Sequence, residues 1–177
     1  GDRTIIVVTS GNLGTSQAVY KSIEKDLKSN NSKINLNTCK TFEQIASYIG
    51  SLNIKHSSPQ GMNTDNVLLG STFIVGGQIK GQQHEMYLIY PQGNYIRPAD
   101  SKPYLVIGEV KYGKPILDRV IKPDISIGDA SRCALISMDS TLRSDLTVGP
   151  PIDFAVLKKD SEKLVALECL NISDDIY

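Results

Sequence analysis

Pairs of amphipathic helical segments alternate with blocks of short apolar segments along this sequence, and this order constrains the fold more than any other feature. A parallel sheet needs a helix after nearly every strand, whereas here several strands follow one another directly. We therefore predict an α+β protein, a four-layer αββα sandwich with two antiparallel sheets between helix layers. The expected elements are a strand at 4–8, helices ending near 28 and spanning 42–52, strands at 71–77, 85–90, 95–97 and 104–107, helices at 112–121 and from 126, and a hairpin of 152–157 and 164–170.

Local signals refine these elements. Capping side chains are expected at three helix starts: Thr15 or Ser16, Thr38 or Thr41, and Ser126. The last long helix is expected to share one apolar face: Ile127, Ala130, Ala134 and Met138, with Cys133 and Leu142 beside it. The polar stretch 57–66 is expected to be a surface loop.

Composition excludes several classes of protein. The chain has 177 residues, which predicts one domain spanning 1–177, and its 19 basic residues balance its 19 acidic ones. Zero net charge argues against a nucleic-acid partner, and no apolar run approaches the roughly 20 residues that span a membrane. Three scattered cysteines and two histidines favour a reducing, cytoplasmic location and offer little for a metal site. We therefore expect no metal and no cofactor.

The turn from the first strand into the first helix, Ser10-Gly11-Asn12-Leu13-Gly14, is one candidate site. Glycines there let the backbone approach a ligand and leave amides to donate hydrogen bonds. The spacing matches neither a dinucleotide-binding motif nor a P-loop. Phosphate binding, an oxyanion hole formed by the Gly11 amide and an ordinary tight turn all remain open, and local spacing alone favours the last.

The segment Arg143-Ser144-Asp145-Leu146-Thr147-Val148-Gly149 is a second candidate site. It gathers a cation, two hydroxyls and a carboxylate, which together can orient a nucleophile on a neighbouring element. The same residues also suit the end of a helix, where Arg143 complements the helix dipole and Gly149 opens the loop. On these residues alone the structural interpretation is favoured.

Five segments in a fixed order carry a resemblance to a known family. They are 9–13, 72–81 (TFIVGGQIKG), 88–95 (LIYPQGNY), 107–119 (IGEVKYGKPILDR) and 137–144 (SMDSTLRS). The chain resembles the proteasome-type peptidases, and most closely their bacterial branch called Anbu, the ancestral β-subunit. The resemblance spans nearly the whole chain, and the part at 112–119 is quite specific.

The resemblance implies an αββα sandwich of the N-terminal nucleophile hydrolase class, in agreement with the element order. It implies a threonine-type peptidase, in which the first residue of the mature chain attacks the peptide carbonyl and its own α-amine serves as base. Gly1 is no nucleophile. We therefore expect the nucleophile and the leading strands upstream of residue 1, further chain beyond the final hairpin, and no activity from this chain by itself.

The resemblance also assigns roles to residues at the first turn. Gly11 matches the glycine whose amide binds the oxyanion, and Thr9 and Leu13 match positions that line the substrate pocket. A third hypothesis, phosphate or nucleotide binding by the same turn, stays open beside this one.

Four further residues are candidates for supporting the N-terminal amine: Glu109, Ser144, Asp145 and Thr147. Thr147 stands where proteasome subunits have a serine, Ser144 where they have an aspartate, and Glu109 where they have a serine. Asp145 is a candidate to compensate for the change at Ser144. These departures also motivate the alternative of a catalytically decayed, proteasome-like scaffold or binding module.

The implied partners are identical subunits in a ring or spiral, a peptide or protein substrate, and an unfoldase of unknown identity. Zero net charge does not oppose such self-association. Neither a nucleic acid nor a membrane is an expected partner.

Overall fold

The computed structural model describes residues 2–29, 33–57, 69–161 and 164–171. The chain divides into two compact units, Ile5–Pro98 and the residues from Ala99 onward together with the segment before Ile5. Each unit is described by itself below. The surface loop expected at 57–66 lies, apart from Ser57, outside the described residues.

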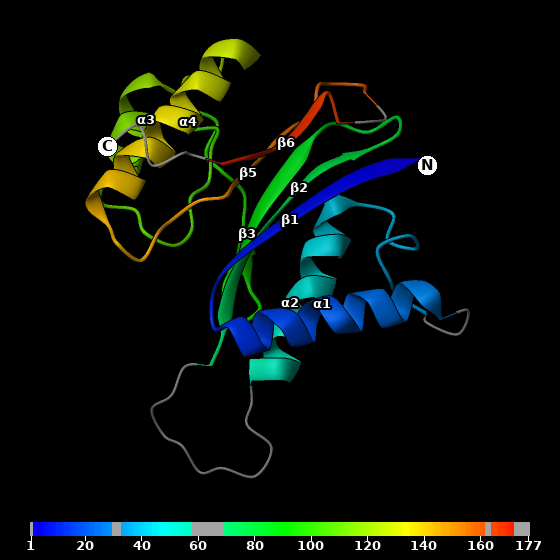
Figure 1. Ribbon diagram of the computed structural model, residues 1–177. Helices are drawn as coiled ribbons and strands as arrows, with labels where there is room; N and C mark the ends of the chain where they lie inside the picture. Colours follow the sequence, from blue (N-terminus) through cyan, green and yellow to red (C-terminus); the bar gives the residue numbers. More distant parts are fainter. Residues whose placement is uncertain (1, 30–32, 58–68, 162–163, 172–177) are drawn as a thin grey trace. The chain divides into compact units, whose positions relative to one another are not determined.

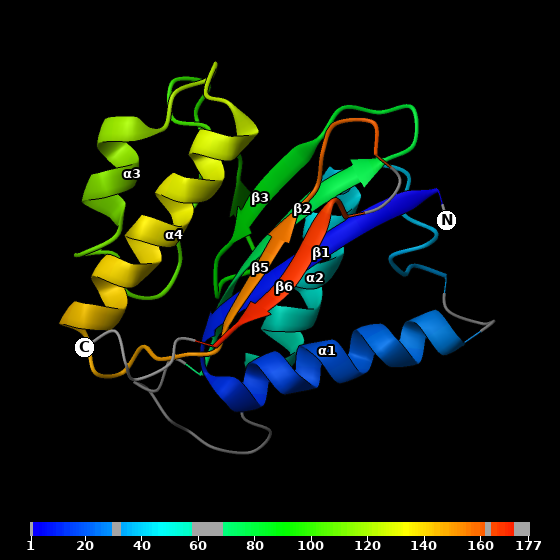
Figure 2. The ribbon, with the colours of Figure 1, turned by 45° about the horizontal axis from the view of Figure 1, so that its top comes forward.

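The unit Ile5–Pro98 contains a four-stranded sheet in the order β1-β2-β3-β4 and two helices (Figure 1). The elements are β1 (Arg3–Gly11), α1 (Leu13–Lys28), α2 (Phe42–Ser57), β2 (Ser71–Ile79), β3 (Glu85–Ile89) and β4 (Tyr95–Ile96). Antiparallel pairing places Phe73 of β2 opposite Ile89 of β3, which is also opposite Tyr95 of β4. Figures 1 and 2 show both helices on one face of this sheet.

The core of this unit lies between the sheet and the two helices. β2 turns Phe73 and Val75 towards it, because successive side chains of a strand face opposite sides. The apolar side chains with no exposed surface, among the residues described, are Val19, Phe42, Ile45, Ala46, Ile49, Phe73, Val75 and Ile89. The four α2 members recur at the three- and four-residue spacing of one helix face, which confirms the helix predicted there.

The start of α1 differs from the prediction. Asn12, rather than Thr15 or Ser16, is the N-cap, and its side-chain oxygen accepts the N–H of Thr15 at 3.0 Å. The prediction for α2 was right for Thr41, whose hydroxyl accepts the N–H of Gln44 at 3.2 Å. β1 runs on to Gly11, so the cap lies immediately after the strand.

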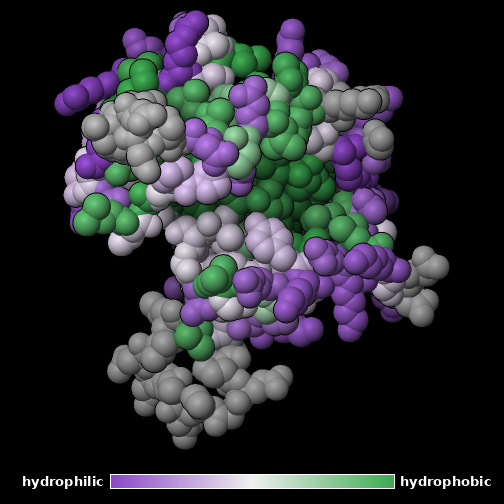
Figure 3. All heavy atoms as spheres, in the orientation of Figure 1, coloured by the Kyte–Doolittle hydropathy of each residue, from purple (hydrophilic) through white to green (hydrophobic). Residues whose placement is uncertain are grey.

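The outer side of α1 is polar. Lys21, Lys25 and Lys28 are exposed there, and hydrophilic side chains cover this helix in Figure 3. None of the helices in the described part of the chain combines the length and the apolar character that crossing a membrane requires.

The unit from Ala99 onward contains two helices and a hairpin. Its elements are α3 (Lys114–Val120), α4 (Ile127–Ser144), β5 (Ile152–Val156) and β6 (Ala166–Leu170). β5 and β6 pair antiparallel with Ile152 opposite Leu170, as predicted. Pro115 lies in the first turn of α3, and Ser126 caps α4 by accepting the N–H of Asp129 at 3.1 Å.

The strand predicted at 104–107 is wrong. The N–H of Tyr104 donates to the carbonyl of Lys102 at 2.9 Å, inside a turn around Pro103. Residues 104–107 pair with no strand in the part of the chain that the structure describes. A β-branched or aromatic run predicts a strand only where a neighbouring strand is available to pair with it.

The packed face of α4 also differs from the prediction. Its buried residues are Cys133, Ser137, Thr141 and Leu142. Ile127 and Met138 of the predicted face are 48% and 39% exposed. A Cβ on Gly113 would lie 2.4 Å from the Ser137 hydroxyl and 3.0 Å from that of Thr141. The backbone at Gly113 lies close to α4, so α4 packs there with its small side chains, Ser137 and Thr141.

Candidate active site

The backbone at Gly11 has a conformation that glycine alone adopts readily. Its φ is +111°, in the region that a Cβ disfavours. A Cβ there would lie 3.1 Å from the carbonyl oxygen of Gly70 and 3.3 Å from the Cα of Ser71. Gly11 itself is exposed, and Leu13, at the first position of α1, is 70% exposed. The turn therefore holds an exposed glycine against the start of β2.

Hydroxyl groups fix this turn from inside. The Ser16 hydroxyl lies 2.9 Å from the hydroxyls of both Thr9 and Ser71. Ser71 in turn donates to the carbonyl of Asn12 at 2.8 Å, and Thr9 donates to the carbonyl of Thr72 at 3.2 Å. The structure thus places the Thr9 hydroxyl within the support of the turn, and the expected place of Thr9 and Leu13 in a substrate pocket stays a prediction.

Asn53 is a buried member of this support that sequence reasoning missed. Its side-chain N–H donates to the carbonyls of Ser71 at 2.6 Å and Tyr90 at 3.2 Å. Asn53 has no exposed surface. Its position in the sequence could have revealed it. Asn53 follows Ile49 by four residues on the apolar face of α2, where a buried polar side chain needs a hydrogen-bonding partner.

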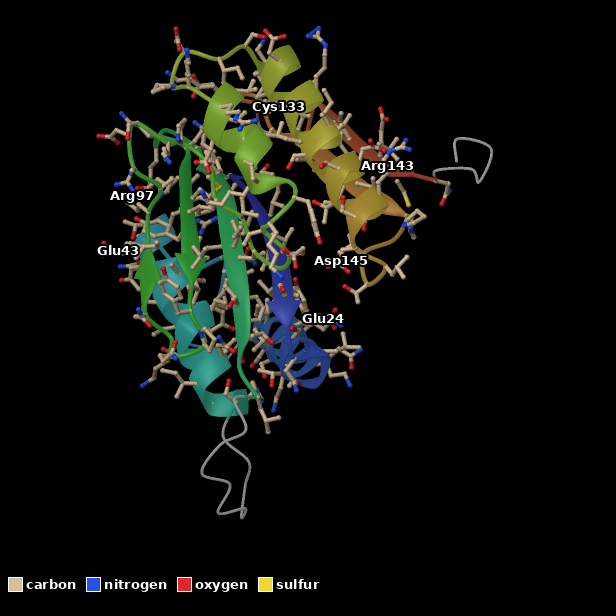
Figure 4. The ribbon with its side chains drawn as sticks, turned by 90° about the vertical axis from the view of Figure 1, so that its left-hand side faces the viewer. Glu24, Glu43, Arg97, Cys133, Arg143 and Asp145 are labelled. Atoms are coloured by element: carbon tan, nitrogen blue, oxygen red, sulfur yellow. The ribbon has the colours of Figure 1, made fainter. Side chains whose placement is uncertain are left out.

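Asp145 and Thr147 form the centre of the second candidate site. Asp145 is the C-cap of α4 (Figure 4), and its N–H donates to the carbonyl of Thr141 at 2.9 Å. One carboxylate oxygen of Asp145 accepts the N–H of Thr147 at 2.8 Å and its hydroxyl at 2.7 Å. The Thr147 hydroxyl, and next its N–H, lower the pKa of Asp145 below its ordinary value.

Glu109 joins the same group from the segment that precedes α3. Its carboxylate accepts the N–H of Lys111 at 2.7 Å and lies near enough to Asp145 to influence the pKa of that carboxyl. The charge of Lys111 also lowers the pKa of Asp145. Of the four candidates for amine support, the structure brings together Glu109, Asp145 and Thr147.

Ser144 is not part of this group. It is exposed, and neither hydrogen bond that Thr147 donates to Asp145 involves it. Arg143 pairs with Asp139 one turn earlier in α4, at 2.9 Å, which agrees with the helix-end interpretation. Among the described ranges of the chain, no three His, Cys, Asp or Glu side chains gather to hold a metal ion.

Asp118 of α3 holds the irregular segment 99–113, which contains Glu109, against the helix. Its carboxylate accepts hydrogen bonds from Lys102 at 2.8 Å, Tyr104 at 2.5 Å and Lys114 at 2.6 Å. Lys102 and Tyr104 lie in the segment, and Lys114 and Asp118 in α3. The lysines, followed by the tyrosine, hold the pKa of Asp118 far below its ordinary value of 3.8. Three donors on one carboxylate thereby tie irregular backbone to a helix.

We expect Asp118→Asn to lower the urea midpoint of unfolding at pH 7. Because the folded pKa of Asp118 is depressed, its contribution is complete above the ordinary value of 3.8 and is lost as the pH falls towards the folded pKa. The difference between wild type and variant should therefore shrink between pH 5 and pH 2. Asp124→Asn, at an exposed acid between α3 and α4, is the control. A difference that stays constant with pH would contradict the charge-based role.

Comparison with known proteins gives the class of the chain. The proteasome subunit family model matches residues 2–157. The chain therefore belongs to the proteasome subunit family. No match was found among curated protein sequences.

Solved structures of Anbu, the ancestral β-subunit, are similar to this chain. Anbu from Yersinia bercovieri is 39% identical over 86% of this chain, with a TM-score of 0.77. Anbu from Hyphomicrobium sp. strain MC1 is 35% identical over 99%, with a TM-score of 0.87. The helical assembly of the Anbu complex from Pseudomonas aeruginosa is 37% identical over 99%, with a TM-score of 0.79.

These similarities confirm the expected resemblance to Anbu. They also confirm an α+β fold of the proteasome type, with helices and two antiparallel sheets. The chain spans 63% of the length of the Yersinia protein, 73% of the Hyphomicrobium protein and 71% of the Pseudomonas protein.

Proposed function

We propose that this chain is part of a self-assembling, threonine-type peptidase that cleaves amide bonds with an N-terminal nucleophile. The observation that carries the proposal is the exposed Gly11 at positive φ, beside an Asn12 carbonyl that the buried Ser16 and Ser71 hydroxyls bind, in a chain of the proteasome subunit family. Such a rigid backbone amide suits a developing oxyanion, because a preorganised donor needs no rearrangement during reaction.

The proposed reaction uses the two candidate sites in different roles. The hydroxyl of the N-terminal residue attacks the peptide carbonyl, and the α-amine of the same residue accepts the hydroxyl proton. The Gly11 amide stabilises the oxyanion of the tetrahedral intermediate. Glu109, Asp145 and Thr147 stabilise the ammonium that forms when the amine takes the proton, since carboxylates favour a nearby positive charge. The proposed nucleophile is a Thr, Ser or Cys at the mature N-terminus of the working protein.

Self-association is part of the proposal. The similar Anbu complex of Pseudomonas aeruginosa is a helical assembly. We propose a ring or spiral of identical subunits, a peptide or protein substrate, an unfoldase partner and a cytoplasmic location for the working protein, on the basis of family membership.

The test is to read the encoded sequence around Gly1 and to assay the full product after processing. We expect a Thr, Ser or Cys at its mature N-terminus and turnover of a panel of fluorogenic peptides. Replacement of that residue by alanine should abolish turnover while sedimentation still shows the assembly. Equal turnover by the 177-residue chain would contradict an external nucleophile.

A catalytically decayed scaffold or binding module is the second candidate function. The observation that favours it is Ser144, which stands where the family has an aspartate and is exposed. Assembly by the full product without turnover of any peptide, and without a Thr, Ser or Cys at its N-terminus, would establish this alternative.

A further inference from the structure

A cavity of about 380 Å³ lies beside α2, and the proposed reaction does not use it. Its lining comes from the segment 33–39, which precedes α2, and from one stripe of α2 that includes Ser47, Tyr48 and Ser51. Most of the lining surface is apolar, and its most buried members are Cys39 and Tyr48. A cavity of this size, with an apolar interior and a few polar groups, is typical of a site for a small molecule.

Hydrogen bonds hold the wall of the cavity that residues 33–39 form. The side-chain oxygen of Asn35 accepts the N–H of Thr38 at 3.0 Å, and the N–H of Cys39 donates to the carbonyl of Asn35 at 3.1 Å. The side chain of Asn35 also donates to the backbone carbonyl of Asp26 in α1, at 3.3 Å. The wall is therefore in place before a ligand arrives, and binding needs little ordering of the chain.

The hydroxyl of Tyr48 already has a partner outside the cavity lining. It donates to a carboxylate oxygen of Asp26 at 2.7 Å, and Asp26 does not line the cavity. Burial, and next this hydrogen bond, raises the pKa of Tyr48 well above its ordinary value of 10.0, so the hydroxyl stays protonated at neutral pH. The Cys39 thiol lies near enough to influence the same pKa. Tyr48 therefore contributes a neutral aromatic surface beside a sulfur atom.

Lys33 supplies the charge of the cavity. Among the described residues that line it, Lys33 alone is charged at neutral pH. Its neighbour Ile34 is an exposed apolar side chain of the same wall. An aromatic ring suits Tyr48 and Cys39, because ring–ring and sulfur–ring contacts are both favourable. A carboxylate suits the ammonium of Lys33, since hydrogen bonds between two charged groups are the stronger kind.

We propose that this cavity binds a small aromatic carboxylate, with the ring against Cys39 and Tyr48 and the carboxylate at Lys33. None of the lining residues belongs to the Gly11 turn, so the site does not depend on the proposed peptidase reaction. Binding should also raise the melting temperature of the chain, because a ligand that binds only the folded state stabilises it.

The first experiment compares two probes, phenylacetate and phenylacetamide, which have nearly the same shape and differ in charge. In amide NMR titrations of the 177-residue chain, the signals of Ile34, Cys39 and Tyr48 should shift with phenylacetate and saturate. We expect a roughly millimolar dissociation constant for a ligand of this size. Phenylacetamide should bind about two- to fivefold more weakly. Shifts that do not saturate, or equal affinity for the two probes, would overturn the proposal.

Substitutions at the rim separate charge from shape. Lys33→Gln should lower the affinity for phenylacetate to that for phenylacetamide and leave the affinity for phenylacetamide unchanged. Lys21→Gln, at an exposed lysine of α1 outside the cavity lining, is the matched control and should change neither. Ser47→Trp places a large ring in the cavity and should abolish binding of both probes. Unchanged binding in Lys33→Gln, or in a folded Ser47→Trp, would overturn the assigned site.

The second experiment uses the thiol of Cys39 as a reporter. Phenylacetate at ten times its dissociation constant should slow alkylation of Cys39 by iodoacetamide about tenfold, because most molecules then carry the ligand. Cys169, which is exposed on β6, is the internal control, and its rate should stay the same. Mass spectrometry of the peptides measures both rates. An equal rate at Cys39 with and without phenylacetate would overturn the placement of the ring.

Discussion

Replacement of Gly11 by alanine in the processed full-length protein is expected to lower kcat by about 100- to 1,000-fold, the usual effect of losing one oxyanion donor. A Cβ at residue 11 would meet the carbonyl oxygen of Gly70 at 3.1 Å and the Cα of Ser71 at 3.3 Å, both of them backbone atoms. The φ of +111° is strained for alanine as well. The backbone must therefore shift, and the amide with it. Fluorogenic peptide turnover measures the effect.

Gly81→Ala is the matched control for this experiment. Gly81 also has a positive φ, +78°, but a Cβ there has no atom within 4 Å. Both substitutions should cost about 1–2 kcal/mol of unfolding free energy from conformation alone, whereas only Gly11→Ala should reduce turnover of the folded protein. Full turnover in Gly11→Ala would show that this amide is not the oxyanion donor.

Much of the fold was predictable because its signals are local. The spacing of Phe42, Ile45, Ala46 and Ile49 sets a helix face whatever it packs against, and these residues are fully buried. The turn at 91–94 and the apolar runs beside it predicted two neighbouring strands, and β3 and β4 pair as expected.

The errors arose where distant residues decide the structure. The face of α4 is selected by Gly113, which precedes Ser137 by 24 residues. Residues 104–107 have the composition of a strand and lack a partner among the described strands. The hydrophobic pattern within one segment shows neither which helix face meets a distant glycine nor whether a pairing strand is available.

The candidate site divides in the same way. The need for glycine at residue 11 follows from a strand that turns at once into a helix, and the sequence marked it. The hydroxyls that hold the turn join Ser16 to Ser71, 55 residues apart, and no local pattern pairs them. Asp145 became a candidate because it follows Ser144 in a family motif. Its contact with Thr147 forms because α4 ends at Ser144 and Asp145 is the C-cap, and the sequence does not fix that helix end.

Asn53→Ala is expected to lower the free energy of unfolding by about 2–4 kcal/mol. The substitution removes the donors to the carbonyls of Ser71 and Tyr90 from a position with no exposed surface. A buried carbonyl without a partner bears the full cost of leaving water. Urea denaturation measures the loss. Asn37→Ala, at an exposed asparagine, is the control and should change stability by less than about 0.5 kcal/mol.

Asn53 should also affect the Gly11 turn, because the two share a neighbour. Asn53 holds the carbonyl of Ser71, and the hydroxyl of Ser71 holds the carbonyl of Asn12, next to Gly11. Amide hydrogen exchange at residues 9–13 should therefore be faster in Asn53→Ala under conditions where the protein stays folded. Unchanged exchange there, together with a large loss of stability, would mean that Asn53 supports the core alone and that the turn is held by its own hydroxyls.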